Sequence, residues 1–319
     1  MKDFKGFVKG IDLGGWLSQC DYSKERLEGF ITENDIRTIA EWGADHVRLP
    51  IDFNVLENDD GTEYKETGFG YVQGAVDMCR KHGMNIIIDL HKTAGFSFDK
   101  GERETGFFES EALQERFCRL WEQIAKRFGN DPVHIAFELL NEVTDQAYSP
   151  VWNKIAEKCV RRIRAIAPDT VILIGSYWNN SVNAVKDLDA PYDDRIVYNF
   201  HCYDPIEFTH QHAPWVDPAQ FDVSRDMTYA ESGATEKYFE ELFAGAIEKA
   251  RENNTVLYCG EYGVIDKVAP EDVLGWYKAI NAVFVKHGIG RCTWSYKEMD
   301  FGLSDSRLDA VRPELLKYI

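Results

Sequence analysis

Two glutamates stand where apolar, strand-like runs of the chain come to an end. Glu142 closes the run Phe137-Glu138-Leu139-Leu140-Asn141-Glu142, and Glu261 lies in Leu257-Tyr258-Cys259-Gly260-Glu261-Tyr262-Gly263. Two carboxyl groups in one pocket are suited to cleaving a glycosidic bond, because one protonates the departing oxygen while the other attacks the anomeric carbon or activates water. The sequence therefore predicts sugar chemistry, provided that the fold brings the two glutamates together.

A barrel of parallel strands meets that condition, since every strand points its C-terminal end at the same mouth. Apolar or β-branched runs recur eight times, at Phe7–Leu13, Ala44–Leu49, Met84–Leu90, Val133–Leu139, Thr170–Ile174, Arg195–Phe200, Thr255–Cys259 and Ile289–Trp294. Most are separated by segments with helical periodicity, such as Leu113, Phe117, Leu120 and Ile124. We predict a single (β/α)₈ TIM barrel over residues 1–319, with a doubly wound open sheet as the alternative.

The connection after the sixth run is longer than one helix requires. Its first part, residues 204–230, carries His210, His212, Pro214, Trp215 and Pro218 without clean periodicity. Long excursions of this kind tend to be functional. We expect this enlarged loop to wall the cleft. Helix signals elsewhere include a capping box at Thr32 and Asp35, and Pro270 in a first helical turn.

Seven short motifs at the predicted strand ends together resemble glycoside hydrolase family 5, the cellulase family, and its bacterial endoglucanases in particular. They are Gly10-Ile11-Asp12-Leu13-Gly14-Gly15-Trp16, His46-Val47-Arg48-Leu49-Pro50, Asp89-Leu90-His91, Leu140-Asn141-Glu142, His201-Cys202-Tyr203, Gly260-Glu261-Tyr262-Gly263 and Thr293-Trp294-Ser295-Tyr296. The resemblance implies a retaining β-glycosidase with Glu142 as acid/base and Glu261 as nucleophile. It also implies a substrate-binding set of Arg48, His91, Asn141, His201, Tyr203 and Trp294.

The chemistry of these residue types agrees with those roles. Arg48 and Tyr203 can hold a carboxylate ionised and oriented, which suits the nucleophile. The Asn141 amide can bond the sugar 2-hydroxyl, and His91 and His201 can donate to other hydroxyls. Trp294 offers a flat floor to a pyranose. Strand alternation and the Asn-Glu pair favour Glu142 over the neighbouring Glu138. Three tryptophans that follow strands or lie in the long loop are candidate outer platforms: Trp16, Trp178 and Trp215.

Composition excludes several other classes. The net charge of −18 argues against a nucleic-acid partner. The opening residues Met1–Val8 are too polar for a signal peptide, and no run reaches membrane-spanning length. Seven scattered cysteines without a C-x-x-C pair indicate reduced thiols. We expect a cytoplasmic monomer without a membrane partner, with secretion through a lost leader as the alternative.

The sequence leaves two alternative functions and several alternative substrates open. A zinc-dependent barrel hydrolase would need closely spaced ligands, and the His210-x-His212 pair lies in an irregular loop; we expect neither a metal nor a cofactor. A noncatalytic sugar-binding barrel would be expected to lack one of the two glutamates. For substrate, the motifs favour β-1,4- or mixed β-1,3/1,4-glucan or its oligosaccharides. The alternatives are an exo-acting β-glucosidase or β-1,3-glucanase, and a β-mannanase.

Overall fold

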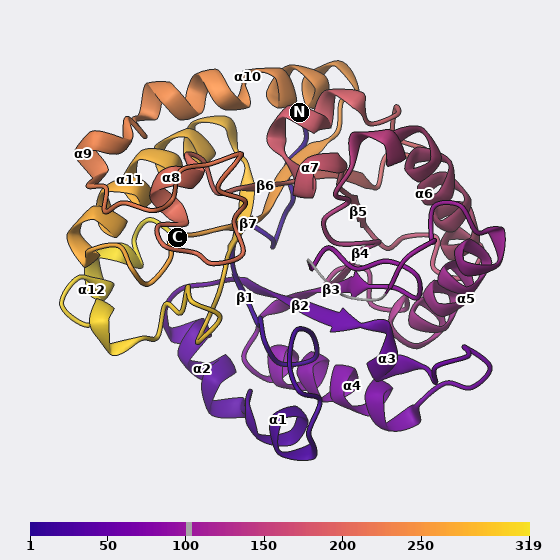
Figure 1. The fold of residues 1–319 in the computed structure, drawn as a ribbon. Coiled ribbons are helices and arrows are strands. Elements are labelled where there is room, and N and C mark those ends of the chain that lie inside the picture. Colours follow the sequence, from indigo (N-terminus) through magenta and orange to yellow (C-terminus); the bar gives the residue numbers. More distant parts are fainter. Residues whose placement is uncertain (100–103) are drawn as a thin grey trace.

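Eight parallel strands close into a barrel in which each strand pairs with the next and β1 pairs with β8 (Figure 1). The computed structural model describes residues 1–99 and 104–319. The strands are β1 (Lys9–Asp12), β2 (His46–Asp52), β3 (Asn85–Lys92), β4 (Ile135–Glu138), β5 (Ile172–Ile174), β6 (Ile196–Cys202), β7 (Val256–Tyr262) and β8 (Gly290–Thr293). Each overlaps one of the eight apolar runs, so the predicted (β/α)₈ barrel is confirmed and the open sheet is excluded.

Helices surround the barrel on the outside (Figure 1). The longer ones are α2 (Glu33–Glu41), α4 (Glu66–Lys81), α5 (Glu111–Phe128), α6 (Ser149–Arg164), α10 (Glu236–Glu252) and α11 (Pro270–His287). Shorter helices and turns lie in the connections: α1 (Lys24–Gly29), α3 (Phe53–Leu56), η1 (Gln146–Tyr148), α7 (Tyr177–Asn180), η2 (Val182–Asp187), α8 (Ile206–Thr209), α9 (Tyr229–Ser232), η3 (Ser306–Leu308) and α12 (Arg312–Leu315). The structure confirms the Thr32–Asp35 capping box at the start of α2 and Pro270 at the start of α11.

Strand alternation decides which side chains reach the functional end of the barrel. In β3, Ile86, Ile88 and Leu90 join the large core between the strands and the helices. Ile87, one residue out of phase, joins a separate core inside the barrel, where Phe4 and Phe7 pack against it from the N-terminal segment. Burying each such aliphatic side chain contributes about 1.5–3 kcal/mol. The next inward positions along β3 are Asp89 and His91, so polar side chains lie closer to the mouth of the barrel than this apolar core.

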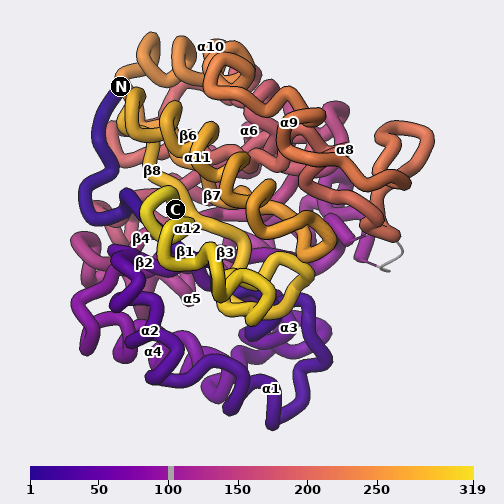
Figure 2. The backbone as a smooth tube through the Cα atoms, turned by 90° about the vertical axis from the view of Figure 1, so that its left-hand side faces the viewer, coloured from indigo at the N-terminus to yellow at the C-terminus, as the bar shows by residue number. Residues whose placement is uncertain are grey.

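The enlarged loop of residues 204–230 follows β6 and contains α8, and α9 begins at its end. In the side view of Figure 2, the chain between α8 and α9 projects from the right-hand side of the molecule. The seven cysteines all lie among the described residues and are unpaired. Within residues 1–99 and 104–319, no helix is both long and apolar enough to cross a membrane.

Candidate active site

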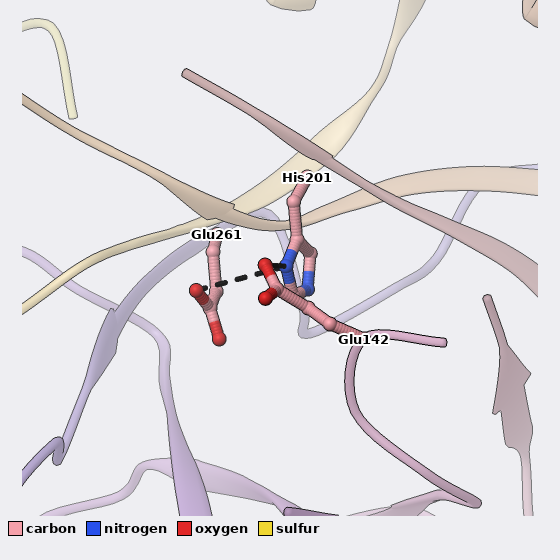
Figure 3. Close-up of side chains that lie close together, drawn as sticks. All are labelled: Glu142, His201 and Glu261. Atoms are coloured by element: carbon pink, nitrogen blue, oxygen red, sulfur yellow. Dashed lines mark hydrogen bonds and ion pairs between the residues drawn. The ribbon is translucent and has the colours of Figure 1, made fainter. Parts of the chain in front are cut away.

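Glu142, His201 and Glu261 point toward one another at the mouth of the barrel (Figure 3). His201 lies on β6 and Glu261 on β7, whereas Glu142 lies four residues beyond the last residue of β4. His201 Nδ1 is 2.9 Å from Glu142 Oε1 and 3.6 Å from Glu261 Oε2. One oxygen of each carboxylate and a ring nitrogen of His201 all lie within 4.8 Å of one another. The two predicted catalytic glutamates therefore converge at the mouth of the barrel.

An irregularity in strand pairing directs Glu261 toward His201 and Glu142. The register between β6 and β7 shifts so that Phe200 pairs with Cys259 but His201 pairs with Glu261. The extra residue is Gly260, where a Cβ atom would lie 2.6 Å from the side-chain oxygen of Asn199. Bulges often redirect a side chain next to an active site. Glycine at position 260 permits the close approach that this bulge requires.

Arg48 lies at the centre of a buried network of carboxyl groups that includes Glu261. Its guanidinium contacts Glu261 Oε1 at 2.7 Å, and Asp12 and Asp89 at 3.0 Å each. It also donates two hydrogen bonds to the Glu138 carboxylate, of 2.7 and 2.9 Å. A guanidinium matches a carboxylate in this bidentate geometry better than an ammonium does. One cation thus holds four carboxyl groups, all of them buried.

Four carboxyls around one arginine cannot all be ionised at low cost. Burial raises the pKa of Asp89 to about 7, raises that of Asp12 well above its ordinary value, and raises that of Glu138. Burial therefore favours the protonated forms of Asp12, Asp89 and Glu138, whereas the charge of Arg48 acts in the opposite direction. Glu138 is fully buried and paired with Arg48, whereas the Glu142 side chain is 12% exposed, which agrees with the preference for Glu142 over Glu138.

Both oxygens of Glu261 accept a hydrogen bond from a group predicted to serve it. Arg48 Nη1 donates to Oε1, and the Tyr203 hydroxyl donates to Oε2 at 2.9 Å. Burial, followed by the charge of Glu261, raises the pKa of Tyr203 well above its ordinary value. Tyr203 therefore remains a protonated donor. These two contacts stabilise Glu261 as a carboxylate and fix its orientation.

Glu142 lies in a different environment. Burial raises its pKa to about 7, while a hydrogen bond from Asn179 Nδ2 to Oε2, 2.9 Å long, acts in the opposite direction. Burial lowers the pKa of His201 to about 4, so its ring is neutral at pH 7. A carboxyl group with a pKa near the working pH can both give and take a proton. The two glutamates thus have environments that suit different roles.

The other residues predicted to bind substrate surround this pair. Asn141 Oδ1 accepts from Arg48, whereas its buried Nδ2 has no hydrogen-bond partner among the described residues and is free to donate. His91 Nδ1 contacts Asp89 at 2.6 Å, and burial lowers the His91 pKa to about 3. The Trp294 ring lies parallel to the His91 ring, with centroids 5.8 Å apart. His201 was expected to donate to a sugar hydroxyl, whereas its Nδ1 lies between the carboxylates of Glu142 and Glu261.

The three candidate outer tryptophans have different surroundings. Trp178 is 53% exposed and Trp215 is 43% exposed, so each has an accessible surface. The Trp215 ring stands edge-on to His210, which packs against Tyr203. Trp16 is only 3% exposed, and its indole donates to the carbonyl of Leu27. Because its faces are covered by the core, we assign Trp16 to packing, which corrects the expectation that it is a sugar platform.

The trio of Glu142, His201 and Glu261 is also the group of described residues whose spacing could hold a metal ion. However, both oxygens of Glu261 already accept hydrogen bonds, and the Arg48 cation lies 2.7 Å from one of them. The surroundings therefore suit an ionised nucleophile better than a metal ligand. His210 and His212 do not converge: His210 contacts Thr209, and His212 contacts Asp226.

Sequence reasoning assigned no role to several groups that complete the site. Asn199 donates to Glu138, and Asp12 and Asp89 pair with Arg48. The sequence does contain an indication for Asp12 and Asp89, because a charged residue inside an apolar strand must bind a partner when it is buried. Asn179 gave no such signal. It follows β5 in an irregular connection whose path could not be inferred from periodicity.

A closed (β/α)₈ barrel with paired carboxylates at its mouth is an arrangement found in glycoside hydrolases. The sequence profile of the family Cellulase (glycosyl hydrolase family 5) matches residues 9–300. The chain belongs to this family, and it is an O-glycosyl hydrolase.

Relatives and solved structures agree with that membership. Cellodextrinase A of Ruminococcus flavefaciens is 57% identical over 287 residues, covering 90% of this chain and 84% of that protein. Endoglucanase C of Acetivibrio thermocellus is 37% identical over 339 residues and covers 98% of both chains. The crystal structure of endoglucanase Cel5A from Thermotoga maritima matches with a TM-score of 0.83 at 25% identity, covering 98% of this chain and 97% of that one.

Proposed function

We propose that the protein hydrolyses β-1,4-linked gluco-oligosaccharides with retention of configuration, with Glu142 as acid/base and Glu261 as nucleophile. The observation that carries the proposal is the short separation of the pair, whose nearest oxygens lie within 4.8 Å. Retaining enzymes hold their carboxyl groups about 5–5.5 Å apart, whereas inverting enzymes need about 6.5–9.5 Å to admit a water molecule. The short separation favours direct attack by Glu261.

The reaction then has two steps. In the first, Glu261 forms a bond to the anomeric carbon while Glu142 transfers its proton to the departing glycosidic oxygen. In the second, Glu142, now ionised, takes a proton from water, and the resulting hydroxyl displaces Glu261 and restores the β configuration. Arg48 and Tyr203 hold the nucleophile, and the free Nδ2 of Asn141 bonds the sugar 2-hydroxyl.

Two relatives support glucan as the substrate class, since one is named a cellodextrinase and the other an endoglucanase. The cellodextrinase is the more similar of the two, which favours soluble oligosaccharides over long polymers. Trp178 and Trp215 are suited to stacking against sugar units beyond the cleaved bond. Mannan is the second candidate, because another structure of Thermotoga maritima Cel5A is a complex with mannotriose.

Initial rates and products from cellohexaose, laminarihexaose, mannohexaose and lichenan test the substrate class. We expect cellohexaose to be cleaved fastest and lichenan to be cleaved where its linkages allow. Mannohexaose should be slower by about tenfold or more, because its axial 2-hydroxyl moves away from the Asn141 amide and leaves that donor unpaired. Faster cleavage of laminarihexaose or mannohexaose would contradict a β-1,4-glucan preference.

A further inference from the structure

The turn after β5 has an unusual backbone. Trp178, Asn179 and Asn180 all have left-handed conformations, with φ values of 51°, 55° and 54°. A left-handed conformation costs roughly 1–2 kcal/mol for most residues, although asparagine tolerates it better than others. Three in succession are kept only where the surroundings hold them, and such strain tends to occur at functional sites.

The segments that hold this turn are the connection that follows Glu142 and strand β6, which carries His201. The main-chain N–H of Trp178 donates to Thr144 O at 3.1 Å, and that of Asn179 donates to Val143 O at 2.9 Å. These acceptors directly follow Glu142 in sequence. On the other side, Ser181 forms a parallel bridge with His201 of β6. The turn is thus fixed to the backbone on both sides of the Glu142–His201 contact.

The strained turn directs two neighbouring amides at that contact. Asn179 Nδ2 donates to Glu142 Oε2 at 2.9 Å, and His201 Nδ1 lies 2.9 Å from the other oxygen, Oε1. Asn180 Nδ2 lies 3.5 Å from His201 Nε2. Asn180 is fully buried and packs so closely on Gly175 that a Cβ atom there would lie 2.2 Å from its side-chain oxygen. Both oxygens of Glu142 are therefore engaged from fixed positions.

We infer that Asn179 is a positioning residue that orients the Glu142 carboxyl group and tunes its proton affinity. This inference rests on the proposed role of Glu142 as acid/base and adds to it a residue outside the seven motifs. An amide N–H favours the ionised form of the carboxylate that accepts from it. Asn179 therefore opposes the effect of burial and helps Glu142 to release its proton in the first step.

Other charged and titratable groups also act on Glu142, and they stay in place when Asn179 is changed. They are Arg48, His201, Asp99, Asp89, Tyr203 and Glu261. Burial raises the pKa of Glu142 to about 7, and the Asn179 hydrogen bond lowers it. Removing this hydrogen bond alone should raise the Glu142 pKa further, and the basic limb of the pH–rate profile should move to higher pH.

Asn179→Gly and Asn179→Asp test the inference, because both residues accept a left-handed backbone while neither supplies the amide. The wild-type kcat/KM on cellotetraose should follow a bell in pH, with apparent pKa values that belong to the interacting pair. In Asn179→Gly the basic limb should move up by about one pH unit. Asn179→Asp should move it further, since it places a second carboxylate beside Glu142.

Asn254 provides matched controls, because it is also an exposed asparagine with a left-handed φ, of 46°. It precedes β7 and so lies at the opposite end of the barrel from the mouth. Asn254→Gly and Asn254→Asp should leave the profile unchanged. A uniform loss of rate in the Asn179 variants, with the basic limb unmoved, would mean that Asn179 only supports the fold and would overturn the inference.

A readout that does not depend on catalysis separates this inference from the proposed function. The ¹³C NMR signal of the Glu142 carboxyl carbon, assigned by its loss in Glu142→Gln, reports the Glu142 pKa directly. We expect it to titrate at higher pH in both Asn179 variants than in the wild type. If the enzyme is active and retaining but the Glu142 titration is the same in the Asn179 variants and the wild type, the inference about Asn179 is refuted and the proposed function stands. If the wild-type enzyme hydrolyses its substrate with inversion of configuration, the proposed function is refuted whatever the titration shows.

Discussion

Azide should revive Glu142→Ala and Glu261→Ala with opposite stereochemistry when an aryl β-cellobioside with an activated leaving group is the substrate. Without Glu142, Glu261 still forms the glycosyl-enzyme, and azide attacks it to give the β-glycosyl azide. Without Glu261 no such intermediate forms, so azide occupies the vacated space and gives the α-glycosyl azide. Proton NMR of the isolated azides distinguishes the two products.

Before rescue, the two variants should show large losses of rate. On unactivated cellotetraose, Glu142→Ala should be slower by about 10²–10⁴-fold, the usual contribution of a general acid. Glu261→Ala should lose on the order of 10⁴-fold or more, because the covalent route is removed. Glu248→Ala, on the exposed face of α10, serves as the control and should match the wild type. Near wild-type rates in either active-site variant would exclude the assignment.

Arg48→Met should be among the most destabilising single substitutions in this chain. The guanidinium contacts Asp12, Asp89, Glu138 and Glu261, and methionine would leave all four carboxyls without their cation. Removing one partner of a buried ion pair costs about 3–5 kcal/mol. We expect a loss of at least this size in the free energy of unfolding at pH 7, measured by urea denaturation, together with loss of hydrolysis.

The pH dependence of that loss should identify its cause. Asp12, Asp89 and Glu138 have pKa values raised by burial even beside Arg48. A carboxyl whose folded pKa exceeds its unfolded value of about 4 stabilises the fold at low pH and loses that contribution as the pH rises through the folded value. The charge of Arg48 lowers these three pKa values, so Arg48→Met should raise them further. The variant should therefore become progressively less stable, relative to the wild type, between about pH 4 and pH 7.

Arg291 offers the matched control. It is also a buried arginine on a barrel strand, but its guanidinium bonds the Asn281 amide oxygen, the main-chain oxygen of Val8 and an oxygen of the terminal residue Ile319, rather than four carboxyl side chains. Arg291→Met should therefore show a much smaller pH dependence of stability than Arg48→Met between pH 4 and pH 7. Equal pH dependence in the two variants would show that the effect at position 48 arises from lost packing rather than from unpaired carboxyls.

The barrel could be predicted because its strands carry strong local signals. Runs such as Met84–Leu90 are apolar on both faces, which is typical of a parallel strand buried on both sides. The ends of such strands meet at one mouth, so Arg48, Glu261 and Tyr203 could be expected to converge without any knowledge of loop geometry. The structure brings these three together as expected.

The parts that could not be predicted depend on irregular backbone. Asn179 reaches Glu142 only through a left-handed turn, and no periodic pattern indicates such a turn. Trp16 follows a strand, as Trp178 does, yet one ring is covered by the core and the other is exposed. Whether an aromatic residue after a strand faces the cleft depends on the path of the following loop, which the sequence pattern does not specify.

Proton NMR of methyl β-cellotetraoside hydrolysis by the wild-type enzyme tests the central claim most directly, because the blocked substrate has no reducing end of its own and so contributes no mixture of anomers. Spectra taken before mutarotation report the anomer released at the newly formed reducing end. A double displacement through Glu261 predicts that the β-anomer appears first and that the α-anomer grows in only as mutarotation proceeds. An α-anomer in the earliest spectra would contradict the account, because it would require direct attack by water rather than by Glu261.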